Sequence, residues 1–256
     1  MRGELVISTA TIIGFLLTLA RMAGVFVFVP LPGLGSRNNQ ARILLAFSMA
    51  IALFPHWPHL EGEVSGGQLT MWVISEAALG IGVGLTVSFL IEGFNVAAQI
   101  MGLQAGYAYA STIDPTSQAD SSVLVIFVEL AVGLMFFALG LHREVIAIFA
   151  RSMEVAPPGT FLPSRSLGAQ LLMMGGTMFS TGVRLALPVV AVLLLVDISL
   201  ALLGRVNAQL QLLTIAFPVK MLVGLSIVGW LMLLMPVLLR NGAIPMLTAA
   251  RALVLR

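Results

Sequence analysis

Residues Glu92 to Asp120 read EGFNVAAQIMGLQAGYAYASTIDPTSQAD, a stretch rich in glycine and polar side chains within an otherwise almost continuously apolar sequence. The segments on both sides of it read as membrane helices, yet this stretch is too polar to face lipid along its whole length. At membrane depth, irregular backbone is tolerated only where protein buries it or where it lines a water-filled path, because lipid offers no hydrogen-bond partners. The stretch is therefore a candidate gate or plug.

The composition of the whole chain predicts an integral membrane protein. Hydrophobic residues make up 59% of the sequence, charged residues make up 9%, and the mean hydropathy is +1.05, which excludes ordinary soluble folds. At about 20 residues per span, the 256 residues have room for about six spans and for no sizeable soluble domain. We expect an all-α membrane protein with about six long, partly broken apolar helices in a single integral membrane domain over residues 1–256.

Charge and motif content exclude several classes of function. The net charge of +2 comes from dispersed basic residues, so no nucleic-acid surface is predicted. Cysteine is absent, which excludes thiolate metal sites and a cysteine nucleophile. Nucleotide-binding and metalloprotease motifs are missing, and the histidines, His56, His59 and His142, share no metal-ligand spacing. We therefore expect neither an enzyme nor a bound cofactor or metal.

Apolar segments and helix breakers divide the chain into predicted elements. A retained first span covers Leu5 to Val29, and Leu69 to Gln104 as one helix would measure roughly 50 Å, more than a hydrocarbon core of ~30 Å. The other predicted elements are a short apolar helix at Ala41 to Phe54, a span at Val123 to Leu141, a mixed-charge connection at His142 to Ser166, a long apolar helix at Leu167 to Leu203, a break at Phe217–Pro218, and a last span at Met221 to Leu239 before a basic tail.

Small and polar side chains recur at steps of three and four along one face of the long predicted helix. This stripe consists of Gly80, Gly84, Ser88, Glu92, Asn95, Gln99, Gly102 and Gly106. Such stripes usually mark packing between helices of one chain, and for Gly80 to Ser88 that interpretation and packing on other subunits both stay open. For the polar half, which contains Glu92, Asn95, Gln99 and Gly102, we predict a face toward other subunits or a wet interior.

Six charged residues fall within the predicted membrane helices: Arg21, Glu76, Glu92, Glu129, Arg184 and Asp197. Each would cost a few kcal/mol at a lipid-facing bilayer centre, so each should face protein or water. In an assembly such charges pair with one another and with neighbouring subunits. In a stand-alone ion or small-solute permease they would form the binding site, here Glu92, Glu129, Arg184 and Asp197. No series of acidic residues and histidines at helical spacing indicates a proton relay, so the assembly role is favoured.

The distribution of arginines bears on topology. With six spans, the side that holds both termini collects more arginines, among them Arg143, Arg151 and Arg251, than the opposite side. The positive-inside rule therefore favours cytoplasmic termini.

Two long runs carry a family resemblance. The first, GFNVAAQIMGLQAGYAYASTIDPTSQADSSVLVIFVELAVGLMFFALGLHREVI, covers Gly93 to Ile146, and the second, RVNAQLQLLTIAFPVK, covers Arg205 to Lys220. In their length, order and spacing they closely resemble the FliR family of flagellar biosynthesis proteins, whose homologues serve in injectisome type III secretion.

This resemblance implies an export-gate subunit that forms, with FliP and FliQ and beside FlhB, the protein-conducting channel for unfolded flagellar substrates. It implies a location in the bacterial inner membrane at the flagellar basal body, with helices arranged as tilted hairpins in a helical assembly. The loop that plugs the channel in this family corresponds to Gly106 to about Gln118, with Gly106, Tyr107, Tyr109, Ile113, Asp114 and Pro115 as its marked residues.

The residue chemistry of this loop suits a movable seal. Large side chains such as Tyr107 and Ile113 can fill a lumen, Met101 can adapt its shape, and the glycines at both ends of the last helical turn can act as hinges. Asp114 followed by Pro115 is typical of a helix start, so the loop is expected to end there.

Overall fold

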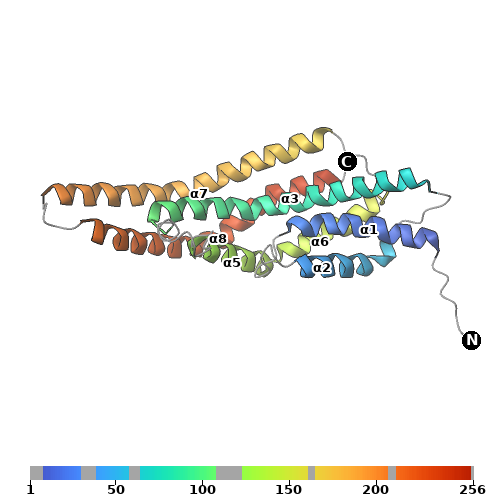
Figure 1. Cartoon of the computed structure of the whole chain (residues 1–256), viewed down its shortest axis with the longest axis horizontal. Helices are drawn as coiled ribbons and strands as arrows, with labels where there is room; N and C mark the ends of the chain where they lie inside the picture. The colour runs from blue at the N-terminus through green and yellow to red at the C-terminus, as the bar shows by residue number, and fades with distance from the viewer. Residues whose placement is uncertain are drawn as a thin grey trace, which may run out of the picture. The chain divides into compact units, whose positions relative to one another are not determined.

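The computed structural model describes residues 8–29, 39–57, 64–107, 123–160, 165–206 and 212–254. Within these ranges the chain is all α-helical, with seven α-helices, one 3-10 turn and no strand. The elements, labelled as in Figure 1, are α1 (Thr9–Phe28), α2 (Asn39–Ala52), η1 (Phe54–His56), α3 (Gly66–Ala105), α5 (Val123–Ala138), α6 (Leu141–Val155), α7 (Arg165–Val206) and α8 (Leu212–Val254).

The predicted all-α membrane fold is confirmed, with fewer and longer helices than six ordinary spans. Among the described residues, four helices (α1, α3, α7 and α8) are long and apolar enough to cross a membrane, and α5 with α6 makes a fifth if the two count as one span broken at Gly140. The helices α3, α7 and α8 contain 40, 42 and 43 residues. Each is therefore about 60 Å long, twice the thickness of a hydrocarbon core of ~30 Å.

Two predicted boundaries were wrong. The segment expected to be a connection after Leu141 forms α6, a helix whose buried face repeats at steps of three and four and consists of Leu141, Val145, Ile148, Phe149, Ser152 and Met153. The expected break at Pro218 is absent, because α8 runs from Leu212 through Pro218 and continues past Leu239 to Val254. Proline is tolerated inside membrane helices where neighbouring groups satisfy the freed carbonyl.

The chain divides into two compact units. The first comprises Met1–Phe89, Gly140–Met174 and Ala243–Arg256, and the second comprises Leu90–Leu139 and Gly175–Gly242. The helices α3, α7 and α8 each contribute residues to both units. That residues 1–256 form one functional domain stays a prediction.

In the first unit, glycines let α1 and α3 approach each other closely. A Cβ atom added at Gly80 would lie 2.1 Å from the carbonyl oxygen of Arg21, and one added at Gly84 would lie 2.7 Å from that of Val25. On the α1 side, a Cβ at Gly24 would lie 2.6 Å from the carbonyl oxygen of Ala77. The Gly80 to Gly84 part of the stripe therefore packs within this chain, one of the two interpretations that the sequence left open.

In the second unit, the C-terminal part of α3 packs against α7 and α8. A Cβ at Gly182 of α7 would lie 2.7 Å from the carbonyl oxygen of Gly93, and one at Gly224 of α8 would lie 2.9 Å from the Cβ of Ala105. Side chains from α3, α5, α7 and α8, including Met101 and Val128, close around a void of only about 10 Å³. Met101 is buried there, so it does not face a lumen as predicted.

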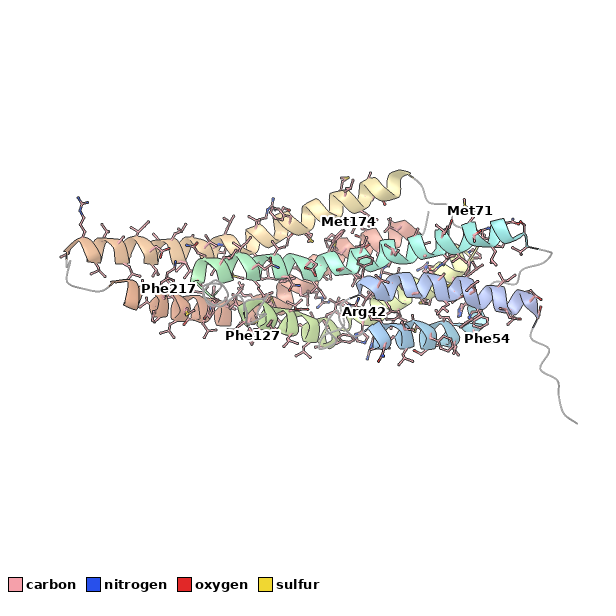
Figure 2. The ribbon with its side chains drawn as sticks, in the orientation of Figure 1. Arg42, Phe54, Met71, Phe127, Met174 and Phe217 are labelled. Atoms are coloured by element: carbon pink, nitrogen blue, oxygen red, sulfur yellow. The ribbon has the colours of Figure 1, made fainter. Side chains whose placement is uncertain are left out.

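Apolar side chains also stand on the outer sides of the helices, as Figure 2 shows for Phe54 and Phe127. These two side chains are 60% and 51% exposed within the chain. Apolar surface on this scale is covered by lipid or by other protein.

Candidate functional site

The predicted plug begins where α3 ends, and the helix ends there for a local reason. Gly106 has a φ angle of 87°, in the left-handed region that glycine adopts without steric cost. Its N–H donates to the carbonyl of Leu103 at 3.2 Å, and the N–H of Tyr107 donates to the carbonyl of Gly102 at 2.9 Å. These two bonds form a Schellman motif, which satisfies carbonyls in the last turn and directs the chain away from the helix axis.

Tyr107 joins this helix end to α8. Its hydroxyl donates a hydrogen bond to the backbone carbonyl oxygen of Met221 at 2.9 Å. Burial raises the pKa of the Tyr107 hydroxyl above its ordinary value of 10.0, so the phenol is protonated at neutral pH and available as the donor. One turn earlier on α8, the ring of Phe217 lies 3.3 Å from the position that a Cβ at Gly106 would occupy. The base of the predicted plug is therefore held against α8 by a hydrogen bond and by ring packing.

The other predicted plug residues, Tyr109, Ile113, Asp114 and Pro115, lie outside the described residues.

The polar half of the stripe on α3 does not share one environment. Asn95 and Gly102 are buried within the chain, whereas Glu92 and Gln99 are exposed. The Asn95 Oδ1 atom is buried and accepts no hydrogen bond from the described residues. This arrangement follows from helix geometry, because residues seven apart lie nearly above one another: Glu92 and Gln99 form one edge of the stripe, and Asn95 and Gly102 form the other edge.

The structure brings two of the six membrane charges together at the centre of the first unit. The Arg21 Nε donates to the Glu76 Oε2 at 2.5 Å, and both side chains are fully buried. The Nη1 of Arg21 donates to the carbonyl oxygen of Ser152 at 3.1 Å and to its Oγ at 3.0 Å, and the Nη2 donates to the carbonyl oxygen of Ala156 at 2.9 Å. The second carboxylate oxygen of Glu76 accepts the N–H of Gly159 at 2.8 Å. The pair therefore ties α1, α3 and the end of α6 into one polar core.

A second ion pair lies in the other unit. The Nζ of Lys220 on α8 lies 2.9 Å from the Oδ1 of Asp197 on α7, and the side-chain amide of Gln104 donates to the Oδ2 of Asp197 at 3.2 Å. Lys220 and Asp197 are 17% and 38% exposed, so this pair is only partly shielded from its surroundings.

The remaining membrane charges do not converge on a site. Glu92, Glu129 and Arg184 are exposed, and within the described residues none of them forms an ion pair or a side-chain hydrogen bond. Asp197 is already engaged by Lys220. Among the described residues, the four residues that a permease site would use therefore form no ion pair or hydrogen bond with one another.

Several partners in these clusters were not singled out from the sequence. Ser152 and Gly159 contribute a hydroxyl and a backbone N–H to the Arg21–Glu76 core, and Gln104 and Lys220 complete the environment of Asp197. Only Lys220 carried a readable signal, because its positive charge at the start of a membrane helix requires a counter-charge. Among the described residues, no group of three or more histidines and acidic residues could hold a metal ion.

Comparison with known proteins places the chain in a family. The family described as "Bacterial export proteins, family 1" matches residues 12–243. The flagellar biosynthetic protein FliR of Escherichia coli K12 is 29% identical over 203 residues, which is 78% of each chain. FliR of Bacillus subtilis 168 is 25% identical over 89% of each chain. The surface presentation of antigens protein SpaR of Salmonella typhimurium LT2 is 26% identical over 87% of this chain and 83% of SpaR. Because the family match covers nearly the whole chain, this protein belongs to the bacterial export proteins, family 1.

Proposed function

We propose that this chain is a subunit of the flagellar type III protein export gate. With FliP and FliQ, and next to FlhB, it would form the channel through which unfolded flagellar substrates leave the cytoplasm. Its place would be the inner membrane, at the flagellar basal body. The observation that carries this proposal is the family match over residues 12–243, together with relatives named for flagellar biosynthesis and, in SpaR, for surface presentation of antigens.

The outer surface of the second unit supports a role inside an assembly. In the most apolar 18-residue windows of α7 and α8, only 17% and 22% of the residues are buried by this chain, against 61% for α3. Exposed charged and polar residues occur on the otherwise apolar helices α3, α5 and α7, namely Glu92, Gln99, Glu129 and Arg184. Charges at bilayer depth face protein or water, so we assign these residues to contacts with partner subunits or to a wet channel. We place Asn95 and Gly102 beneath that surface, where they hold α3 close to its neighbours.

The anchored helix end supports the proposed plug. Gly106 turns the backbone out of α3, and Tyr107 fixes the first residue of the loop to α8. A plug needs one firm end, so that its tip can leave the lumen and return without the loop detaching from the wall. We propose that Tyr109 and Ile113 fill the closed lumen and that Asp114 and Pro115 end the loop at the next helix.

In this mechanism the chain forms part of the path for the exported polypeptide and supplies the loop that closes this path. The closed loop would block ions while the gate is idle, and a translocating polypeptide would displace it. In this proposal the energy for substrate movement would come from elsewhere in the machine.

The plug can be tested by deleting Tyr109 to Thr116 in cells that also express FliP and FliQ. Native mass determination of the copurified complex should give the same mass, less the deleted residues, because the deletion leaves α3, α7 and α8 intact. Membranes containing the variant complex should then pass small ions that the parent complex holds back. The matched control is Tyr107→Phe, which keeps the full loop and removes only the hydrogen bond to Met221, and it should leak far less.

Two results would contradict the proposal in different ways. An assembled complex with unchanged ion permeability would remove the plug while leaving the export gate in place. Failure of the chain to copurify with FliP and FliQ, combined with solute uptake by the protein purified alone, would instead favour the permease.

A further inference from the structure

The first unit contains a basic cavity that the export function does not use. It lies between α6 and the last turns of α8, has a volume of about 160 Å³, and is lined by Ala147, Ile148, Arg151, Arg251 and Val254. A water molecule occupies about 30 Å³ in the liquid, so the cavity has room for several waters or for one phosphodiester group. Two arginines that are 100 positions apart in sequence, Arg151 and Arg251, belong to this lining.

The two arginines of this cavity differ in their partners. The Nη2 of Arg251 lies 2.7 Å from the Oε2 of Glu144, one turn before Ala147 on α6, so that carboxylate accounts for one of the two arginines. Arg151 is exposed and has no ion pair or side-chain hydrogen bond within the described ranges. Glu154, three residues further along α6, forms no ion pair with Arg151; the basic group nearest to it is the His56 Nε2 at 3.6 Å, which is charged only when protonated. Of the two arginines in the lining, Arg151 therefore has no ion-pair partner among the described residues.

The geometry pre-organises the site for an anion. An arginine carries five N–H donors in a rigid fork, and the single contact with Glu144 occupies only part of the Arg251 fork. A phosphate group carrying one negative charge would give Arg151 an ion-pair partner and accept hydrogen bonds from both guanidinium groups.

Apolar surface beside the cavity decides the source of the phosphate. Val155 on α6, one turn after Arg151, is 51% exposed, and Ile244 on the adjoining stretch of α8 is 58% exposed. A free anion would leave this apolar surface exposed, whereas the acyl chains of a phospholipid would cover it. Basic pockets next to membrane helices are a known mode of binding acidic phospholipid headgroups.

We propose that Arg151 and Arg251 form a binding site for the headgroup phosphate of one anionic phospholipid, with its acyl chains against Val155 and Ile244. The site would fix the height of α6 relative to the bilayer surface, independently of the plug.

The proposal is tested by native mass spectrometry of the full-length chain in mild detergent, with phosphatidylglycerol titrated in. One phosphatidylglycerol molecule should bind in preference to phosphatidylcholine. Because one arginine near a membrane surface contributes about fivefold to the binding of acidic lipid, Arg151→Gln should weaken the affinity by about that factor. Arg143→Gln is the matched control, since Arg143 is exposed on the same helix and lies outside the cavity lining.

Two further variants separate the lipid site from a purely structural role of the arginines. Arg151→Lys keeps the charge and should retain binding better than Arg151→Gln. Glu144→Gln removes the competing carboxylate and should bind phosphatidylglycerol at least as tightly as the parent chain. A merely structural contact between Arg251 and Glu144 predicts the opposite, because Glu144→Gln would then loosen α8 and weaken binding.

Three outcomes would overturn the proposal. Equal binding of phosphatidylglycerol and phosphatidylcholine would show that charge is not recognised. Equal effects of Arg151→Gln and Arg143→Gln would show that the cavity is not the site. Saturable binding of inorganic phosphate that depends on Arg151, without preference for phosphatidylglycerol, would assign the cavity to a free anion.

Discussion

The Arg21–Glu76 and Lys220–Asp197 ion pairs differ in what surrounds them. Arg21 and Glu76 are fully buried, and every polar group of the pair has a partner inside the first unit. Lys220 and Asp197 in the second unit are partly exposed and have one further side-chain partner, Gln104. A buried pair stabilises the folded state of its unit. A partly exposed pair can instead exchange partners when another subunit or a translocating chain approaches.

This difference follows from desolvation. Moving a charge out of water costs several kcal/mol, so a buried pair persists only when its hydrogen bonds are complete, and removing one partner leaves an uncompensated charge. A partly exposed pair keeps some solvent around both groups. Such pairs typically contribute about 0–1 kcal/mol to the free energy of unfolding. We therefore expect the first unit to be the rigid part of the subunit and the α7–α8 end of the second unit to be the adaptable part.

The largest expected effect is that of Glu76→Ala. Arg21 would stay buried with no counter-charge, and the N–H of Gly159 would lose its acceptor. Removing one member of a buried pair costs about 3–5 kcal/mol, so the variant should unfold at a clearly lower temperature in detergent, or fail to accumulate. The measurement is the thermal unfolding midpoint of the purified chain.

The control for this prediction replaces both charges. Buried pairs are often replaceable by apolar residues of similar size, so Arg21→Met combined with Glu76→Met should recover much of the lost stability. The recovery should be incomplete, because the Ser152 and Gly159 groups lose their partners. A double variant less stable than Glu76→Ala would show that the pair itself, and not the unpaired charge, dominates.

A smaller effect is expected from Gly80→Ala, which tests whether the first unit is rigid. The added Cβ would lie 2.1 Å from the backbone carbonyl oxygen of Arg21, and backbone cannot move aside as a side-chain tip can. Overpacking of this kind costs typically about 1–3 kcal/mol. The thermal unfolding midpoint should therefore fall, by less than for Glu76→Ala.

Gly67→Ala is the matched control on the same helix. The nearest atom to an added Cβ at Gly67 is the Ser65 Oγ at 4.0 Å, so the change meets open space. Alanine has the higher helix propensity, and the variant should be as stable as the parent chain or slightly more stable. If Gly80→Ala behaved in the same way, α1 and α3 would have room to separate and the first unit would not be rigid.

The sequence predicted the features that depend on local pattern. The length of α3 followed from the unbroken apolar run and its stripe, and the end of the helix at Gly106 followed from the glycine itself. The position of α6 was missed because only one face of that helix is apolar, so its overall composition resembles a connection. A 3.6-residue period in Leu141, Val145, Ile148 and Phe149 was present but was outweighed by four charged residues nearby.

The features that depend on pairing across the fold could not be predicted. Arg21 and Glu76 are 55 positions apart, and each could have been matched by several other charges. Their pairing follows from the close approach of α1 and α3 at Gly24, Gly80 and Gly84, which is a property of the folded unit. The cavity between α6 and α8 arises in the same way, because its two arginines come from distant segments.

The smallest expected effect is that of Asp197→Asn, which tests the adaptable pair directly. Asparagine keeps the shape of the side chain and its contact with Gln104, and it removes only the charge that lies 2.9 Å from the Lys220 Nζ. Because both groups are partly exposed, the loss should be below about 1 kcal/mol. It should shrink further in high salt, which screens exposed pairs far more than buried ones.

The salt dependence separates the two pairs more sharply than the size of the effect does. The difference in thermal unfolding midpoint between the parent chain and Asp197→Asn should shrink as the salt concentration rises. The corresponding difference for Glu76→Ala should not depend on salt, because no ion reaches that buried pair. Lys220→Gln should reproduce Asp197→Asn, and combining both changes should add nothing, since either one already breaks the same interaction. A deficit for Asp197→Asn that is as large as that of Glu76→Ala and insensitive to salt would mean that Asp197 is shielded as well, and the second unit would then be as rigid as the first.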